Sequence, residues 1–245
     1  MKTLTSKPQQ RPLDVDQVAR FYHDQFVAEQ VEHFERVALP SIDISRTVVD
    51  IGGGCGYFAG ALQRTIGLYT RVLDSDPTSI SRALEDGVDA VLCDALSPVK
   101  SNDEGVICFN LILHHLVGKT EEETLALQKR AMTVWRNRDI KIFVNEYIYE
   151  SFFGDISGWL IYQITKSTFL SEAGRAISRV FPSLRANTFG VGVRFRSNKE
   201  WRRIFNECGF SLHKEVRGAS ERVSLPRRFL VIKQIRRDSF LLVTK

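Results

Sequence analysis

The sequence predicts an α/β fold in which helices cover both faces of a seven-stranded, mostly parallel sheet. Short apolar segments alternate with helix-like segments five times between residues 47 and 144. A glycine-rich loop joins the first of these strands to the next helix, and two further apolar segments near the C-terminus close the sheet. Such alternation is typical of parallel strands connected by right-handed helical crossovers.

The elements of the alternating part follow from apolar periodicity and from residues that begin helices. An apolar stripe at spacings of three and four predicts a helix over residues 14–37. Pro77 begins a second helix, and Thr120 with Glu123 forms a capping box for a third that ends near residue 136. The parallel strands are predicted at residues 47–51, 71–74, 90–94, 105–113 and 140–144, with the first crossover helix at 57–65.

The alternation stops after the fifth strand. The segment that follows is too long for a simple loop and carries aromatic residues at helix-like spacings, so we expect a helical insertion that forms a lid over the substrate. Ser197 and Glu200 form a second capping box, and the helix that they begin ends at Gly209. The closing strands are predicted at residues 211–216 and 229–235.

These elements divide the chain into five segments around one α/β core. The N-terminal residues are polar, include two prolines and lack the apolar stretch of a signal peptide, so we expect a disordered tail. The predicted segments are this tail at 1–12, an N-terminal helical cap at 13–46, the ligand-binding core at 47–149, the helical lid at 150–191, and a C-terminal helix with the closing hairpin at 192–245.

The composition is that of an ordinary globular protein, with 43% hydrophobic and 26% charged residues. No apolar run reaches the roughly 18 residues of a membrane span, so no membrane partner is expected. The cysteines form no Cys-x-x-Cys pair, which disfavours a metal site and indicates reduced thiols in the cytoplasm. They are Cys55, Cys93, Cys108 and Cys208.

Charge is unevenly distributed along the chain, whose net charge is +5. Residues 194–245 carry 14 Lys and Arg against 5 Asp and Glu, giving +9, whereas the rest has 20 against 24, giving −4. Such a segment could meet nucleic acid or an anionic substrate. It lacks the aromatic and basic interleaving of an RNA-binding surface, so a solvated face is favoured and no nucleic-acid partner is expected.

The sharpest signal is a run of glycines, Gly52, Gly54 and Gly56, directly after a strand that contains Asp50. Glycines at this junction permit a tight turn and a close approach of the backbone to a ligand. The G-x-G-x-G spacing differs from the dinucleotide fingerprint and from the phosphate-binding loop. On spacing alone, a tight turn without a ligand is the alternative.

Acidic residues end the next two predicted strands. Asp74 and Asp94 therefore share the carboxyl edge of the sheet with the glycine loop, and open α/β sheets bind ligands at that edge. A carboxylate at the second strand suits the two hydroxyls of a ribose, and one at the third can meet an adenine amino group. Asp76 is the alternative ribose ligand, although it suits a helix cap better.

This combination resembles the class I S-adenosylmethionine (SAM)-dependent methyltransferases over roughly residues 48–144 and the closing hairpin. The glycine loop matches the first motif of that family, residues 73–77 the acidic second, residues 93–95 the third, and residues 109–116 the fourth-strand motif of many small-molecule members. The resemblance implies a Rossmann-like sheet with strand order 3-2-1-4-5-7-6, SAM as co-substrate, and no metal.

The resemblance also implies roles for single residues. Gly52, Gly54 and Gly56 would let the loop approach the amino-acid part of SAM, and Asp50 would orient that loop or hold the SAM ammonium. The other expected contacts are Asp74 with Ser75 at the ribose, Asp94 with Ala95 at the adenine, and Asn110 at the methionine moiety.

Residues for catalysis come from the same edge of the sheet. A general base helps when the methyl acceptor is a hydroxyl or an ammonium, and His114 and His115 follow the fourth strand there. Neighbours in an extended segment point to opposite sides, so one of the pair should face the pocket. We expect catalytic roles for His115, Asn145 and Tyr22, and substrate contacts from His114, Glu146 and Tyr162. Packing or loop capping is the alternative for these side chains.

The predicted function is O- or N-methylation of a small molecule in specialised metabolism, because an aromatic insertion suits a planar or apolar substrate. One alternative is a cyclase of the same fold that converts SAM to azetidine-2-carboxylate and methylthioadenosine. An RNA methyltransferase and a SAM-binding protein without catalysis are further alternatives. A homodimer is compatible with the sequence.

Overall fold

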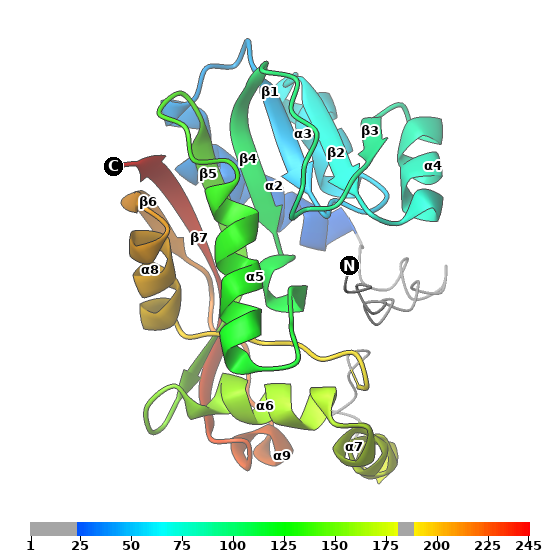
Figure 1. Ribbon diagram of the computed structural model, residues 1–245, viewed down its shortest axis with the longest axis vertical. Helices are drawn as coiled ribbons and strands as arrows, with labels where there is room; N and C mark the ends of the chain where they lie inside the picture. Colours follow the sequence, from blue (N-terminus) through cyan, green and yellow to red (C-terminus); the bar gives the residue numbers. More distant parts are fainter. Residues whose placement is uncertain (1–23, 181–188) are drawn as a thin grey trace, which may run out of the picture.

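The structure, a computed structural model, describes residues 24–180 and 189–245. Its strands are β1 (Thr47–Ile51), β2 (Thr70–Asp74), β3 (Asp89–Leu92), β4 (Glu104–Asn110), β5 (Lys141–Ser151), β6 (Phe210–Arg217) and β7 (Ile232–Thr244). They form one sheet in the order β3-β2-β1-β4-β5-β7-β6, which confirms the predicted order (Figure 1). Neighbours from β3 to β5 are parallel, whereas β7 is antiparallel to both β5 and β6.

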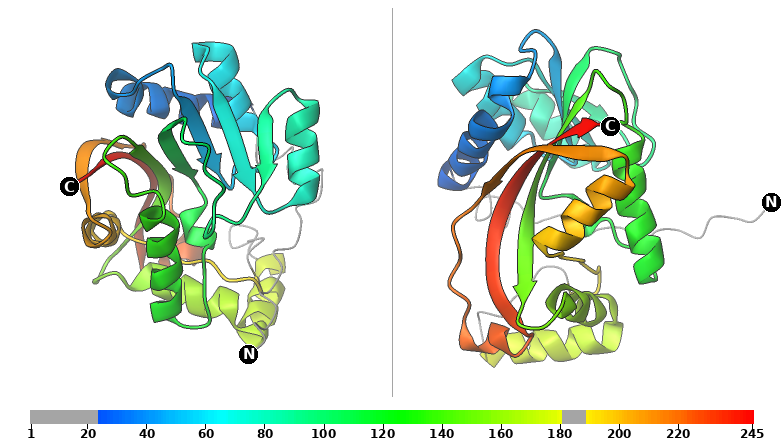
Figure 2. Two further views of the ribbon diagram at one scale, coloured as in Figure 1. Left: turned by 45° about the horizontal axis from the view of Figure 1, so that its top comes forward. Right: turned by 90° about the vertical axis from the view of Figure 1, so that its left-hand side faces the viewer.

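The described helices are α2 (Asp24–Val37), η1 (Leu39–Ser41), α3 (Tyr57–Ile66), α4 (Pro77–Glu85), η2 (Leu113–His115), α5 (Glu121–Thr133), α6 (Ile156–Lys166), α7 (Thr168–Val180), α8 (Asn198–Glu207) and α9 (Leu225–Arg228). Helices α2 and α3 pack on one face of the sheet, and α5 and α8 pack on the other. Helices on both faces confirm the predicted α/β fold (Figures 1 and 2).

The sheet supplies an apolar core to each face. On one face Phe34 of α2 and Phe58 of α3 surround Phe143 of β5, with ring centroids 5.2 and 6.5 Å from that of Phe143. On the other face Trp135, which follows α5, and Trp201 of α8 are fully buried. Because successive side chains of a strand point to opposite faces and both faces are covered, the central strands are apolar over most of their length.

The predicted helix starts are confirmed by their caps. Asp76 accepts hydrogen bonds from the Thr78 and Ser79 amides at the start of α4. Thr120 accepts the Glu123 amide at the start of α5, and Ser197 with the residue three positions later forms a full capping box at α8. Each cap satisfies amides that have no partner inside the helix.

The sequence analysis placed the ends of two strands two or three residues beyond their observed ends. Strand β4 ends at Asn110 rather than residue 113, because Leu111 has φ of 59° and η2 follows. Strand β3 ends at Leu92 rather than residue 94, because the Asp94 carboxylate accepts the Leu96 amide and turns the chain. Polar side chains that bond to nearby backbone compete with strand pairing in this way.

The position of the second closing strand was predicted wrongly. Strand β7 begins at Ile232 and continues to Thr244, whereas the predicted strand begins at Phe229, an exposed residue that caps the end of α9. The charged residues of β7 do not follow the apolar pattern of a buried strand. Arg236 and Asp238 are nevertheless buried, because they pair with each other at 2.9 Å. Strand β5 pairs with β7 and therefore also continues past its predicted end at residue 144.

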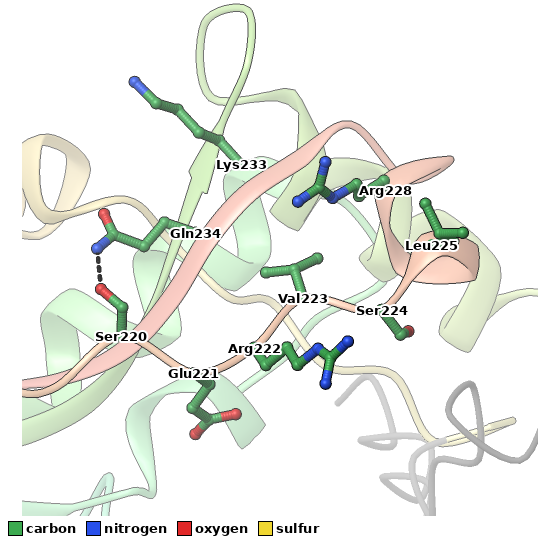
Figure 3. A pocket seen from close by; sticks show the side chains of 9 residues that line it. All are labelled: Ser220, Glu221, Arg222, Val223, Ser224, Leu225, Arg228, Lys233 and Gln234. Carbon is green, nitrogen blue, oxygen red and sulfur yellow. Dashed lines mark hydrogen bonds between the residues drawn. The ribbon is translucent and has the colours of Figure 1, made fainter.

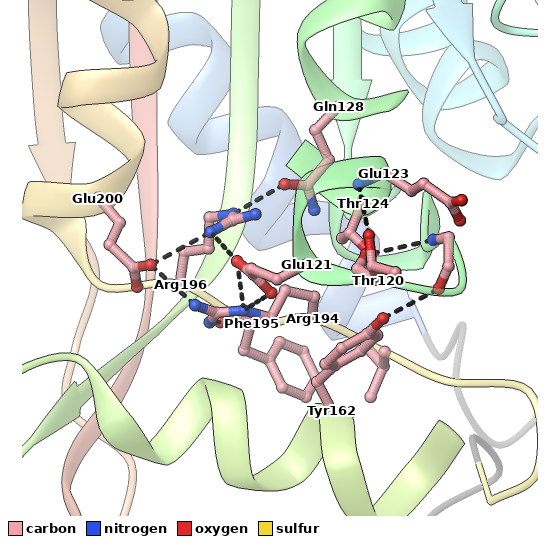
Figure 4. A network of polar contacts seen from close by, with 12 residues as sticks. Thr120, Glu121, Glu123, Thr124, Gln128, Tyr162, Arg194, Phe195, Arg196 and Glu200 are labelled. Atoms are coloured by element: carbon pink, nitrogen blue, oxygen red, sulfur yellow. Dashed lines mark hydrogen bonds and ion pairs between the residues drawn. The ribbon is translucent and has the colours of Figure 1, made fainter. Parts of the chain in front are cut away.

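The predicted insertion contains α6 and α7, and its role as a lid stays a prediction. The chain after it is held by Arg194 and Arg196, both of which are buried. Both arginines pair with Glu121 of α5 and Glu200 of α8, at 2.9 to 3.1 Å (Figure 4). Arg196 also donates to Gln128 at 2.7 Å. This network joins the returning chain to two helices of the core.

Candidate functional site

The glycine loop, residues 52–56, connects β1 to α3 at the carboxyl edge of the sheet. Gly52, Gly54 and Gly56 have φ of 68°, 55° and 76°, a region that other residues disfavour. A Cβ atom at Gly52 would lie 2.5 Å from Cγ1 of Ile112, whereas one at Gly54 would meet no atom within 4 Å. The loop is therefore closely packed at its start and open to a ligand at Gly54.

Asp74, at the end of β2, holds this loop. Its Oδ2 accepts the Gly54 amide at 2.9 Å, and its Oδ1 accepts the Asp76 amide at 2.8 Å. Each carboxylate oxygen has a second lone pair, so both can still accept a hydrogen bond. Asp76 caps α4, so Asp74 is the carboxylate that bonds the loop, and its role at a ribose stays a prediction.

Asp50 lies beneath the loop and is 2% exposed. Burial, together with the nearby Asp74 carboxylate, raises the pKa of Asp50 to about 8. Within the described residues, neither Asp50 Oδ1 nor Oε1 of the buried Gln30 on α2 has a hydrogen-bond partner. Both residues line a cleft of about 20 Å³ beside the glycine loop. Such a space suits one small donor, the size of a water or an ammonium group.

The ends of β4 and β5 meet next to this cleft. Asn110, which lines the cleft, is in register with Asn145 and accepts a hydrogen bond from its Nδ2 at 2.9 Å. Oδ1 of Asn145 is a further buried acceptor without a partner in the described part of the chain. Two predicted site residues thus come together with Asp50 at one edge.

A histidine and a glutamate form a buried pair at the same edge. His114 Nδ1 lies 2.6 Å from Oε2 of Glu146, whose Oε1 accepts the Leu113 amide at 2.7 Å. Glu146 is therefore fixed at both oxygens. Burial and the neighbouring His114 lower the pKa of His115 well below its usual range, so His115 is neutral near pH 7.

Four aromatic rings lie in a row that includes His114. Tyr149 stacks on Phe195 with ring centroids 4.2 Å apart, and Phe195 stacks on His114 at 4.9 Å. His115 completes the row, 4.2 Å from His114. The row links β5, the chain that returns from the insertion, and η2, and it fixes the two histidine rings.

The predicted adenine and ribose contacts occupy the β2–β3 side of the edge. The Cys93 amide donates to the Asp74 carbonyl at 2.7 Å, which brings Asp94 and Ala95 next to the end of β2. Asp94 and Ser75 are exposed, and Ala95 is partly buried against the core.

Two predicted site residues, Tyr162 and Tyr22, are not among the residues that the structure brings together beside the glycine loop. Tyr162 is fully buried and donates from its hydroxyl to the Gly118 carbonyl, at 2.9 Å (Figure 4). Tyr22 lies outside the described residues.

The sequence analysis missed Gln30 and Phe195. Gln30 lies between Val27 and Val31 on the buried side of α2, and a polar residue within an apolar stripe was the available signal. Phe195 had no such signal, because its place beside His114 depends on how the chain returns after the insertion.

Within residues 24–180 and 189–245, no group of three or more His, Cys, Asp or Glu is placed to hold a metal ion. The same residues contain no helix long and apolar enough to span a bilayer.

No family model and no curated protein matches the sequence. Solved structures do match, and they show that the fold is that of class I SAM-dependent methyltransferases. The MccD protein superposes with a TM-score of 0.57 at 12% identity, over 91% of this chain and 97% of that one.

Two methyltransferases match at a similar level. Geranyl diphosphate C-methyltransferase from Streptomyces coelicolor A3(2) gives a TM-score of 0.56 at 11% identity, over 94% of this chain and 78% of that one. Phosphoethanolamine N-methyltransferase 2 from Haemonchus contortus gives 0.54 at 11% identity, over 93% of this chain and 59% of that one. At these identities the likeness concerns the fold.

Proposed function

We propose that the protein binds SAM at the glycine loop and transfers its methyl group to a hydroxyl or amino group of a small molecule. The observation that carries this proposal is the pair of buried acceptors, Asp50 Oδ1 and Gln30 Oε1, that lack a partner in the described chain. Unpaired buried acceptors are costly, and the α-ammonium of SAM would satisfy both.

The rest of SAM would follow the edge of the sheet. The open side of Gly54 leaves room for the ligand, and the free lone pairs of Asp74 suit the ribose hydroxyls. Asp94 and Ala95, with Ser75, are the proposed neighbours of the adenosine. The named methyltransferases support this proposal, because both were solved in complex with S-adenosylhomocysteine.

SAM supplies an activated methyl group, so the protein must align the acceptor and remove its proton. With Glu146 accepting the hydrogen on Nδ1 of His114, the Nε2 lone pair is available to take that proton as the acceptor gains the methyl. S-adenosylhomocysteine is then the second product. His115 is the alternative base, and Asn145 is proposed to orient the acceptor or SAM. The catalytic role of Tyr22 and the substrate contact of Tyr162 stay predictions.

Titration calorimetry with SAM near neutral pH tests the binding step. Asp50 carries a proton in the free protein, because its pKa is about 8, and pairing with the ammonium should ionise it. We expect release of about one proton for each SAM bound, measured in two buffers of different ionisation enthalpy. The Asp50→Asn variant should release none. Absence of SAM binding would contradict the proposal.

Incubation with SAM alone, followed by mass spectrometry, separates methyl transfer from the cyclase reaction. The proposal predicts no methylthioadenosine without an acceptor. With small-molecule acceptor pools, S-adenosylhomocysteine should accumulate, and His114→Ala should reduce its rate by about a hundredfold while SAM affinity is kept. A larger loss of rate in His115→Ala than in His114→Ala would identify His115 as the base that takes the acceptor proton. Steady production of methylthioadenosine would overturn the assignment of methyl transfer.

A further inference from the structure

Exposed apolar side chains gather at one end of the molecule. Of the fourteen large exposed apolar side chains in the described residues, nine lie in segments 152–177 and 225–229. Helices α6, α7 and α9, which carry most of them, lie together at the end away from β2 and β3 (Figures 1 and 2). Phe153, Leu225 and Phe229 are 74%, 75% and 87% exposed. Large exposed apolar patches mark interaction sites.

Two of these segments are held side by side. The Phe152 amide donates to the Val231 carbonyl at 3.0 Å, and Ser151 pairs with Ile232 at the end of the sheet. The turn before α6 therefore lies against the chain that joins α9 to β7. This contact places the exposed rings of Phe152 and Phe153 next to the segment that carries Leu225 and Phe229.

Positive charge surrounds the same segment. Arg222, Arg228 and Lys233 line an open groove of about 680 Å³ that also includes Leu225, and Glu221 is the carboxylate among its lining residues (Figure 3). No hydrogen bond or ion pair ties the side chains of these three cations to other residues of the described chain. We define the basic–apolar surface as Phe152, Phe153, Leu225 and Phe229 with Arg222, Arg228 and Lys233.

We propose that the basic–apolar surface binds the interface of an anionic phospholipid membrane. Aromatic and aliphatic side chains enter the boundary between headgroups and acyl chains, and cations pair with the lipid phosphates. This contact is peripheral and needs no spanning helix, the feature whose absence led the sequence analysis to expect no membrane partner.

Two other occupants fit this surface less well. A symmetric contact with a second copy of the chain would bring the three cations of one protomer against the same three of its partner, and like charges oppose such pairing. Nucleic acid would match the charge but not the aliphatic part, because Leu225 offers no face on which a base can stack.

Sedimentation with vesicles tests the proposal. The protein should bind vesicles that contain phosphatidylglycerol at least about tenfold more tightly than vesicles of phosphatidylcholine alone, since each basic side chain near the surface contributes about fivefold. The double variant Phe153→Ser with Phe229→Ser should bind at least about tenfold more weakly to the anionic vesicles. The double variant Arg228→Gln with Lys233→Gln should lose most of the preference for anionic lipid.

Matched controls change exposed residues elsewhere on the surface. Tyr69→Ser and Lys199→Gln should leave vesicle binding unchanged, and SAM affinity should be the same in all variants, so this test is independent of the proposed methyl transfer. Equal binding to both vesicle types, or full binding by the double serine variant, would overturn the proposal. So would a dimer in sedimentation velocity that Phe229→Ser abolishes, or RNA binding that the serine substitutions leave intact.

Discussion

At the scale of single residues, Asp50 is the group whose protonation we expect SAM binding to change most. It is buried without a partner for Oδ1, and its pKa rises from 3.8 to about 8. The folded protein therefore holds this proton more tightly than the unfolded chain does. The resulting contribution to stability is complete below about pH 4 and is lost as the pH rises towards 8.

We predict that this loss is measurable in the ligand-free protein. Between pH 4 and 8, Asp50 should lower the free energy of unfolding by up to about 1.4 kcal/mol per pH unit. Urea unfolding at a series of pH values should show a shallower decrease for Asp50→Asn than for the wild type. Parallel pH profiles for the two proteins would show that Asp50 is already ionised when buried.

Residues of the site could be predicted where strand ends and loops reveal them. Asp50 and Asp74 lie within the last two residues of β1 and β2, so their common edge followed from the parallel topology. The pairing of His114 with Glu146 could not be predicted, because it joins side chains 32 residues apart whose rotamers depend on tertiary packing. The sequence analysis named both residues but not their contact.

At the scale of elements, the glycine loop combines a backbone requirement with a packing requirement. Gly52 has a positive φ and no room for a Cβ atom beside Ile112, whereas Gly67 has a positive φ with no atom within 4 Å. Gly67 ends α3 on the far side of that helix from the loop. Substitutions at the two positions therefore distinguish the effect of backbone strain alone from the effect of displacing the glycine loop.

We predict that Gly52→Ala and Gly67→Ala both lower the free energy of unfolding, by at least about 1 kcal/mol, because both place alanine in the left-handed region. Gly52→Ala should in addition weaken SAM binding at least about tenfold, since the loop must move away from Ile112. Calorimetry on the two variants measures this difference. Equal SAM affinities of the two variants would show that the glycine loop is not part of the SAM site.

Element boundaries were predictable where a local signal exists. The caps at Asp76, Thr120 and Ser197 fixed three helix starts correctly. The length of β7 had no local signal, because its charged stretch is buried only through partners on β5 and β6. Non-local pairing thus overrode the apolar pattern.

At the scale of the whole molecule, the buried arginine network holds the C-terminal part against the core. Arg196 joins α5, α8 and β5, since its side chain pairs with Glu121 and Glu200 and its carbonyl accepts the Tyr149 amide at 3.1 Å. Removing one partner from such a network leaves the other buried charges uncompensated.

We predict that Arg196→Ala lowers the free energy of unfolding by about 3 kcal/mol. The matched control is Arg203→Ala, which removes an exposed arginine that pairs with Glu207 on the same helix, and it should cost less than about 0.5 kcal/mol. Chemical denaturation of both variants checks this. Similar small losses would mean that the network contributes little to stability.

The measurement that tests the central claim most directly is titration of SAM into the wild type, Asp74→Ala and Asp103→Ala. Asp103 bonds Thr47 and Arg71 at the opposite edge of the sheet, so its variant controls for the loss of a carboxylate. The account predicts saturable binding to the wild type and to Asp103→Ala, and no measurable binding to a folded Asp74→Ala. Unchanged affinity in Asp74→Ala would contradict it.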